Sequence, residues 1–133
     1  ALAVLFESGI QHFADKVDSY MALPTFALEF LKNVPVAWDK TKLVSGYPGD
    51  HAILARQKGE SWYISGIHGK TAPQAYTFSF SFLGDGEYQL SLLKDGENKE
   101  KLVHETIPVT KTKQMTVELL PRGGFTGVIK PVE

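Results

Sequence analysis

Ala75-Tyr-Thr-Phe-Ser-Phe-Ser-Phe82 is the stretch of the sequence that decides the fold. Aromatic residues occupy every second position from Tyr76 to Phe82, and alanine, threonine and serine lie between them. Because successive side chains of a β-strand point to opposite faces, this period of two predicts a strand with one apolar and one polar face. We expect Tyr76 and the three phenylalanines to lie in a hydrophobic core.

Shorter runs on either side of this stretch also have strand character. They cover Ala37–Leu43, His51–Gln57, Ser61–Ile67, Tyr88–Lys94, Leu102–Val109, Gln114–Leu119 and Gly124–Ile129. Turn sequences such as Lys58-Gly-Glu60 and Gly84-Asp-Gly86 separate them, because glycine and aspartate favour tight turns. About eight short strands at regular spacing predict a mainly β fold, an antiparallel β-sandwich of Greek-key type.

Residues 1–34 have a different pattern, in which two helical stripes follow an apolar run. The run Ala1–Phe6 predicts a buried strand. The stripes consist of Ile10, Phe13, Ala14 and Val17, and of Phe26, Ala27, Phe30 and Leu31. Their spacing predicts two amphipathic helices, the second of which starts at Pro24 and ends before Pro35. A strand followed by helices is an α/β pattern, so we divide the chain into residues 1–34 and a sandwich at 35–133.

Composition limits the classes of protein to which the chain can belong. Its 133 residues suit one domain. The 14 basic and 15 acidic residues argue against a nucleic-acid partner, because phosphate binding needs a clustered positive surface. The absence of cysteine excludes disulfides and thiolate metal sites. Ala1–Phe6 is too short to span a membrane and lacks the basic leader of a secretory signal, so we expect a piece of a longer protein.

Neither the histidines nor the acidic residues have the spacing of a metal site. The histidines are His12, His51, His68 and His104. We expect structural or neutral roles for them, with His51 and His68 at the surface. An acidic stretch contains Asp85, Glu87, Asp95, Glu97 and Glu100. It lacks the regular spacing of a calcium loop, so we interpret its Asp-Gly sequences as tight turns. No G-x-S-x-G or G-x-x-x-x-G-K sequence supports a serine nucleophile or a phosphate site.

Glu7 is the carboxylate whose position indicates chemistry, because it directly follows the apolar run. A strand of a (β/α)8 barrel would deliver such a side chain to the mouth of the active site. At the start of a helix, a carboxylate is instead stabilised by the helix dipole. The sequence leaves both interpretations open, and a glycosidase needs a pair of carboxylates rather than one.

Aromatic side chains offer another kind of site, because their flat apolar faces complement sugar rings. The candidates are Trp38, Tyr47, Trp62 and Tyr63. Strand alternation places Trp62 and Tyr63 on opposite faces, and we expect Trp62 to be a core residue. If two or three of these aromatic residues are exposed, the alternative function is a carbohydrate-binding module.

Motifs along the chain resemble those of a known enzyme family. They are Phe30-Leu-Lys-Asn-Val-Pro-Val-Ala-Trp-Asp39, then Gly46-Tyr-Pro-Gly-Asp50 with Ile53–Gly59 and Trp62–Gly66, and upstream Val4–Ser8 with Gln11 and Ala14-Asp15. The first is similar to F-L-K-x-(V/I)-P-x-x-W-D-(E/D)-T of glycoside hydrolase family 97, bacterial α-glucosidases and α-galactosidases. Lys40 departs from that pattern, and Gly9 replaces a proline that usually follows the upstream E-S pair. The similarity covers nearly the whole chain.

The resemblance implies an enzyme of three parts, an N-terminal β-supersandwich, a catalytic (β/α)8 barrel and a C-terminal β-sandwich. Residues 1–34 would be the last barrel strand and helix with a linking helix, and residues 35–133 would be the sandwich. The family's sandwich is regarded as an interdomain and oligomerisation element. Its catalytic glutamates and calcium-binding carboxylates lie upstream of Ala1. No catalytic, metal-binding or cofactor-binding residue is therefore assigned here, and Glu7 receives no chemical role.

Partners and location follow from the same resemblance. We expect this chain to contact the missing barrel and N-terminal domain of its own parent chain, and to take part in a homo-oligomer. If the alternative function holds, an oligosaccharide on exposed aromatic residues is a further partner. The resemblance implies Ca²⁺ for the parent enzyme and a periplasmic or secreted location. Substrate choice between α-glucosides and α-galactosides, and inversion or retention, depend on carboxylates outside this chain.

An isolated chain without its barrel should expose apolar surface at Ala1–Phe6 and on one side of the linking helix. We therefore predict that the 133-residue chain self-associates and binds a dye specific for apolar surface. Light scattering and dye fluorescence measure these two properties. A monomer that binds no dye would contradict the prediction.

Overall fold

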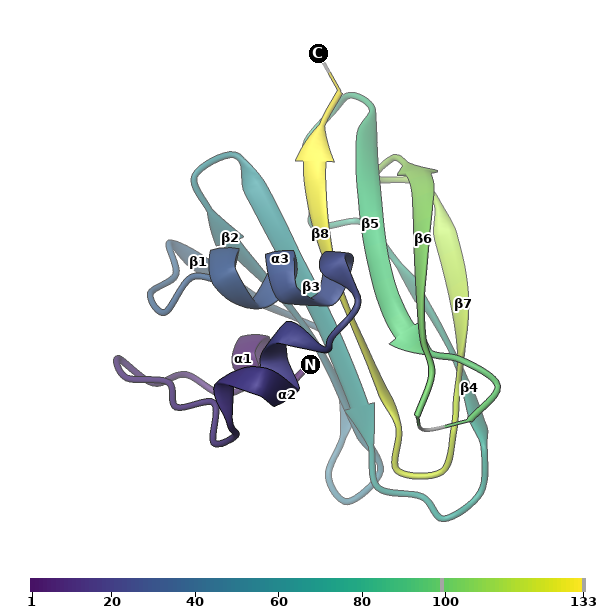
Figure 1. Cartoon of the computed structure of the whole chain (residues 1–133). Helices are drawn as coiled ribbons and strands as arrows, with labels where there is room; N and C mark the ends of the chain where they lie inside the picture. Colours follow the sequence, from purple (N-terminus) through teal and green to yellow (C-terminus); the bar gives the residue numbers. More distant parts are fainter. Residues whose placement is uncertain (99, 133) are drawn as a thin grey trace.

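Two antiparallel β-sheets and three short helices make up the structure, a computed structural model that describes residues 1–98 and 100–132 (Figure 1). The strands are β1 (Lys40–Tyr47), β2 (His51–Lys58), β3 (Ser61–His68), β4 (Gln74–Ser79), β5 (Tyr88–Asp95), β6 (Leu102–Val109), β7 (Gln114–Leu119) and β8 (Gly124–Pro131). One sheet has six strands in the order β1-β2-β3-β8-β5-β6, and β4 pairs with β7 in the other. The last strand, β8, lies between β3 and β5 and is antiparallel to both. The predicted antiparallel sandwich of Greek-key type is confirmed.

The strands agree closely with those predicted from the sequence. β6 and β7 have the predicted bounds, and β2, β3, β5 and β8 only extend slightly further at their C-terminal ends. β1 starts at Lys40 rather than Ala37 and continues to Tyr47. β4 ends at Ser79, because the chain then enters a turn in which Leu83 N–H donates to the carbonyl of Phe80 at 2.9 Å.

The two sheets enclose a hydrophobic core that contains the predicted aromatic residues. Phe78 and Phe80 are buried in it, and Tyr76 and Phe82 pack at its edge. Phe78 stacks on Phe125 of β8 with ring centroids 5.6 Å apart, so an aromatic pair joins the sheets. Gly66 of β3 makes room for this ring, since a Cβ there would lie 2.4 Å from it. The alternation that predicted the fold therefore supplies the centre of its core.

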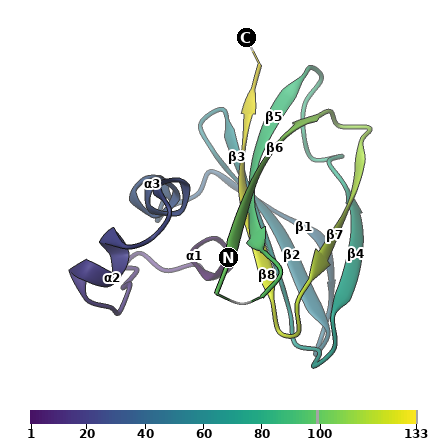
Figure 2. The ribbon, with the colours of Figure 1, turned by 45° about the vertical axis from the view of Figure 1, so that its right-hand side comes forward.

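Helices cover the outer face of the six-stranded sheet, the face turned away from β4 and β7 (Figure 2). They are α1 (Leu2–Leu5), α2 (Val17–Met21) and α3 (Thr25–Asn33). A second cluster of buried residues fills the space beneath them, and it contains Val4, Ala27, Phe30, Tyr63 and Leu93. The middle strands of the six-stranded sheet are thus covered on both faces, and β3 is buried along most of its length, whereas the edge strands β1 and β6 are largely exposed.

Helix α3 agrees with the helix predicted after Pro24. Pro24 precedes its first turn, and the helix ends at Asn33. Ala27 and Phe30 of the predicted apolar stripe are buried against the sheet, which is how an amphipathic helix gains most of its stability. No helix in the described part of the chain is long and apolar enough to cross a membrane.

The prediction of a strand at Ala1–Phe6 is wrong, because Leu2–Leu5 form helix α1. A short apolar run does not by itself distinguish a buried strand from a helix. Here the backbone bonds locally, with Leu5 N–H donating to the carbonyl of Ala1 at 3.2 Å. The predicted burial is correct for Val4 and Leu5. Residues 1–34, all of which the structure describes, contain no strand.

The helix predicted from Ile10, Phe13, Ala14 and Val17 is also wrong. Residues 6–16 are irregular, and α2 starts only at Val17. Polar side chains compete with helical hydrogen bonding in this segment: Ser8 bonds the backbone of Ile10, and Asp15 accepts the N–H of the next residue at 2.7 Å. Ile10 is 72% exposed, so this apolar stripe does not cover the sheet.

Candidate functional site

Three of the four aromatic residues considered for sugar stacking are covered by the fold. Trp62 lies in the core between the sheets, as predicted. Tyr63 is also buried, on the other face of β3 beneath the helices, and is 9% exposed. Trp38 is half-buried and packs edge-on against Tyr63, with ring centroids 5.2 Å apart. Among these four, Tyr47 at the end of β1 is strongly exposed.

The prediction that His51 and His68 lie at the surface is wrong. His68 is buried at the end of β3, and its Nε2 lies 2.7 Å from the carbonyl oxygen of Leu120. His51 is half-buried, and both imidazoles pack against the ring of Tyr76 from β4. Strand β3 continues to His68 and turns its imidazole toward the second sheet.

Asp50, in the turn between β1 and β2, joins this histidine cluster. Its carboxylate accepts the hydroxyl of Tyr76 at 3.1 Å and lies 3.7 Å from Nζ of Lys70. Burial acts to raise the pKa of Asp50, but Tyr76, Lys70 and His51 together hold that pKa below its ordinary value. A lowered folded-state pKa means that the contacts contribute stability above about pH 3.9, and that this stability is lost as the pH falls through the folded value.

A chain of polar contacts that no sequence motif indicated joins Ser45, His51 and Asp50. Oγ of Ser45 lies 2.8 Å from Nε2 of His51, and Nδ1 of His51 lies 3.4 Å from Oδ2 of Asp50. The order resembles that of a serine hydrolase, but the second contact is too long for a good hydrogen bond. Because Asp50 also binds Tyr76 and Lys70, we interpret the contacts as a clamp on the β1–β2 hairpin.

The described residues of the acidic stretch do not converge as a calcium site would require. No group of three or more His, Cys, Asp or Glu residues that could hold an ion occurs in residues 1–98 and 100–132. Asp85 pairs with Lys111, and Asp95 accepts the backbone N–H of Gly124 at 3.3 Å. Calcium needs six to eight converging oxygen atoms, whereas these carboxylates bind donors of the protein itself.

Glu7 has a structural partner in Arg56 of β2. The guanidinium of Arg56 is buried, and its Nη1 lies 3.3 Å from Oε2 of Glu7. Its Nη2 donates at 3.1 Å to the carbonyl of Leu5, the last residue of α1, and so satisfies a carbonyl that a helix end leaves free. The guanidinium also lies 5.8 Å from the ring centroid of Trp38. Glu7 follows a helix and precedes irregular chain, so neither sequence interpretation of it applies.

Hydrogen bonding around this pair is incomplete within the described residues. Nε and Nη1 of Arg56 and Nε1 of Trp38 are buried without a hydrogen-bond partner. The side chain of Glu7 is 73% exposed, and solvent weakens its attraction for the guanidinium. Since a buried charge is costly when poorly paired, a surface that covers Glu7 and excludes this solvent would strengthen the pair.

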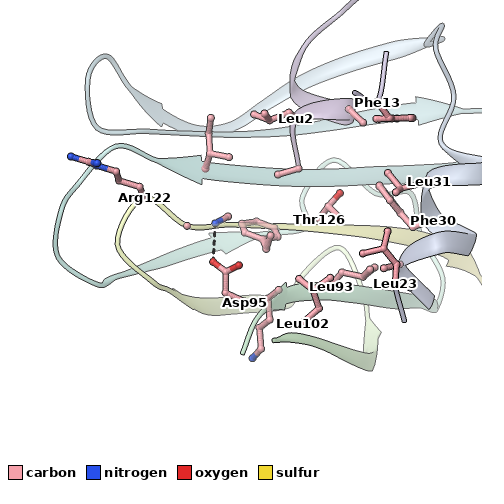
Figure 3. A pocket seen from close by; sticks show the side chains of 18 of the residues that line it. Leu2, Phe13, Leu23, Phe30, Leu31, Leu93, Asp95, Leu102, Arg122 and Thr126 are labelled. Atoms are coloured by element: carbon pink, nitrogen blue, oxygen red, sulfur yellow. Dashed lines mark hydrogen bonds between the residues drawn. The ribbon is translucent and has the colours of Figure 1, made fainter. Parts of the chain in front are cut away.

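An apolar cavity of about 630 Å³ lies between the helices and the outer face of the six-stranded sheet (Figure 3). Leu23 and Phe30 line it from the helical side, and Leu93 lines it from β5. Asp95 lies at one end, where its carboxylate accepts the N–H of Gly124. A predominantly apolar lining suits packing contacts rather than acid–base chemistry.

Sequence and structure both match known proteins. The family described as "Glycosyl-hydrolase 97 C-terminal, oligomerisation" matches residues 37–130. A retaining α-galactosidase of Bacteroides thetaiotaomicron is 35% identical over an alignment of 134 positions, and the alignment covers 98% of this chain. A protein of Streptomyces bingchenggensis named "Probable retaining alpha-galactosidase" is 39% identical over 128 residues and 96% of this chain. A solved glycoside hydrolase family 97 enzyme of Pseudoalteromonas sp. strain K8, in complex with acarbose, superposes with a TM-score of 0.92 at 27% identity over 99% of this chain.

These relatives are much longer than the chain. It covers 20% and 19% of the two curated relatives and 22% of the Pseudoalteromonas enzyme. The chain therefore spans about a fifth of the length of the relatives that it matches.

Replacing Arg56 with methionine should destabilise the chain by roughly 1–3 kcal/mol, because the bond to Leu5 and the charge beside Glu7 are both lost. Arg122→Met, at the exposed turn before β8, is the matched control and should change stability by less than about 0.5 kcal/mol. Glu7→Gln should cost at most about 1 kcal/mol, because the carboxylate is exposed. Urea unfolding measures the free energy of unfolding of all three variants. If the Arg56→Met variant is as stable as the wild type, the guanidinium does not anchor α1.

Proposed function

The chain belongs to the family of glycoside hydrolase 97 C-terminal domains, and from this membership we propose that it is the non-catalytic C-terminal β-sandwich of a longer glycoside hydrolase. It packs on the catalytic part of the parent enzyme and contributes to an oligomer. The family match confirms the resemblance found in the motifs, and the family's description as an oligomerisation domain supports the second role. Asp85 and Asp95 each bind a donor of the protein itself, and the cavity beneath the helices is apolar. Both features favour a contact domain over a catalytic one.

The distribution of exposed apolar side chains carries the proposal. Six of the eleven large apolar residues that are exposed in the described chain lie within residues 1–21: Leu2, Phe6, Ile10, Phe13, Val17 and Met21. This segment lies on the helical side of the molecule, away from β4 and β7 (Figure 2). A gathering of exposed apolar side chains marks a contact surface. The same segment contains Glu7, whose pairing with Arg56 improves if another surface covers it.

Subunit contacts in the proposed oligomer do not use the two edges of the six-stranded sheet. β1 and β6 are the two edges of the six-stranded sheet. The register of β1 is irregular between Leu43 and Ser45, and β6 contains Pro108, which has no N–H to donate. Bulges and prolines of this kind discourage the addition of another strand.

For the parent enzyme, we propose hydrolysis of α-linked galactosides with retention of configuration. The names of the two curated relatives support this substrate over α-glucosides, which the sequence left equally open. We propose that any Ca²⁺ is bound outside this chain, since its carboxylates do not form an ion site in the described residues. A periplasmic or secreted location in a bacterium is proposed on the family resemblance, and the two α-galactosidase relatives come from Bacteroides and Streptomyces, which are bacteria.

Val17→Glu tests the docking surface. Val17 is 75% exposed in this chain, so the substitution should change the stability of the isolated 133-residue chain by less than about 0.5 kcal/mol. In the full-length enzyme the same glutamate would be buried without a partner, and we expect the free energy of unfolding to fall by about 2 kcal/mol or more. Chemical denaturation of both forms measures the difference.

Val132→Glu is the matched control, because Val132 is also exposed but follows Pro131, the last residue of β8. The C-terminal end of β8 lies far from α2 (Figure 1). It should be tolerated in both forms. If Val17→Glu is tolerated in the full-length enzyme as well, the catalytic part does not cover this segment, and the docking proposal fails.

A further inference from the structure

A second cavity of about 630 Å³ lies on the other side of α3 from the apolar one. Phe26, Glu29 and Asn33 line it from the helix, and β3, β8, β5 and β6 each contribute residues to its floor. In Figure 1, β8 and β5 continue past α3 on this side, so the sheet face there is not covered by a helix. We call this space the α3 groove. Its lining is mixed, with polar and apolar side chains in comparable amounts.

One wall of the α3 groove is fixed by contacts within the protein. The imidazole of His104 stacks on Phe26, with ring centroids 5.1 Å apart and an angle of 21° between the planes. Nε2 of His104 lies 2.7 Å from Oγ of Ser91, which holds the imidazole from the sheet. A helix and two strands therefore position an aromatic surface before any ligand arrives, and preorganisation of this kind reduces the entropic cost of binding.

Tyr63 provides an unused polar group in the same place. Its ring is 9% exposed and lines the α3 groove. Its hydroxyl makes no hydrogen bond to another part of the described chain, and burial alone raises the pKa of Tyr63, so the group keeps its proton at neutral pH. The hydroxyl oxygen is not one of the fully buried unpaired atoms, so water reaches it, and a ligand in the groove would replace that water with a hydrogen bond of its own.

The chemistry of the lining selects the class of ligand. Glu29 and Lys130 place one charge of each sign at the groove, which favours a neutral ligand over an anion. A purely apolar ligand would cover the amide of Gln89 and the hydroxyl of Tyr63 without offering either group a hydrogen-bond partner. A sugar ring has an apolar C–H face and an edge of hydroxyl groups, so it matches an aromatic wall beside amides and hydroxyls.

We propose that the α3 groove binds a neutral saccharide, with the C–H face of a pyranose against Phe26 and hydroxyls bonded to Gln89 and Tyr63. This inference goes beyond the proposed docking and oligomer roles and does not depend on them. It also differs from sugar stacking on exposed tryptophans, because the aromatic wall is a phenylalanine from α3 and the tyrosine acts through its hydroxyl.

Calorimetric titration of the full-length enzyme with D-galactose and with D-glucose tests the proposal. We expect a binding site in addition to the catalytic one. Gln89→Ala and Tyr63→Phe should each weaken the additional site about three- to tenfold, the effect of removing one hydrogen bond. Hydrolysis of a chromogenic α-galactoside should keep its wild-type rate in both variants, since neither residue belongs to the catalytic part.

Gln114→Ala and Tyr47→Phe are the matched controls, because both residues are exposed and lie outside the groove. They should leave both sites unchanged. Inorganic phosphate should not compete with the sugar at the additional site. A single site in the wild-type enzyme, wild-type affinity in both groove variants, or competition by phosphate would overturn the proposal. None of these results bears on docking, which the Val17→Glu experiment measures separately.

Discussion

Burial of the middle strands of the six-stranded sheet on both faces is the constraint on which the rest of the structure depends. Trp62 and Ile64 of β3 enter the core shared with β4 and β7, whereas Tyr63 enters the cluster beneath the helices. A sheet covered on both sides must also satisfy the polar groups on its second face. Ser65 does so by donating its hydroxyl to that of Thr126 at 2.6 Å. The short helices are therefore a layer of the fold rather than an appendage.

The same constraint explains the character of the proposed function. A sheet whose faces both carry packing contacts has few polar side chains free to converge on a substrate. What the outer face offers is an anchor at Arg56, an apolar cavity and an exposed apolar segment. These are the features of a domain that positions other parts of a protein. The α3 groove is the exception, because there the sheet extends past its helical cover and keeps polar side chains accessible.

Strand positions could be predicted from the sequence because alternation and turn residues are local signals, and Ser61–Ile67 needed only one more residue to match β3. Ala1–Phe6 could not be assigned in the same way, because an apolar run of six residues fits a strand or a helix until its packing partner is known. The Glu7–Arg56 pair joins residues far apart in sequence, although both occur in the motifs that carried the family resemblance. The groove was missed for a related reason: Phe26, Tyr63 and His104 come from three segments that meet only in the folded chain.

Amide hydrogen exchange in β3, measured with and without residues 1–35, tests the central claim most directly. If the helices complete a second core, their removal should leave Tyr63 and the guanidinium of Arg56 exposed, and the amides of β2 and β3 should lose much of their protection, or the shortened chain should fail to fold. If the shortened chain folds and its β3 amides exchange as slowly as before, the second core is not needed, and the account of a sheet stabilised from both faces is contradicted.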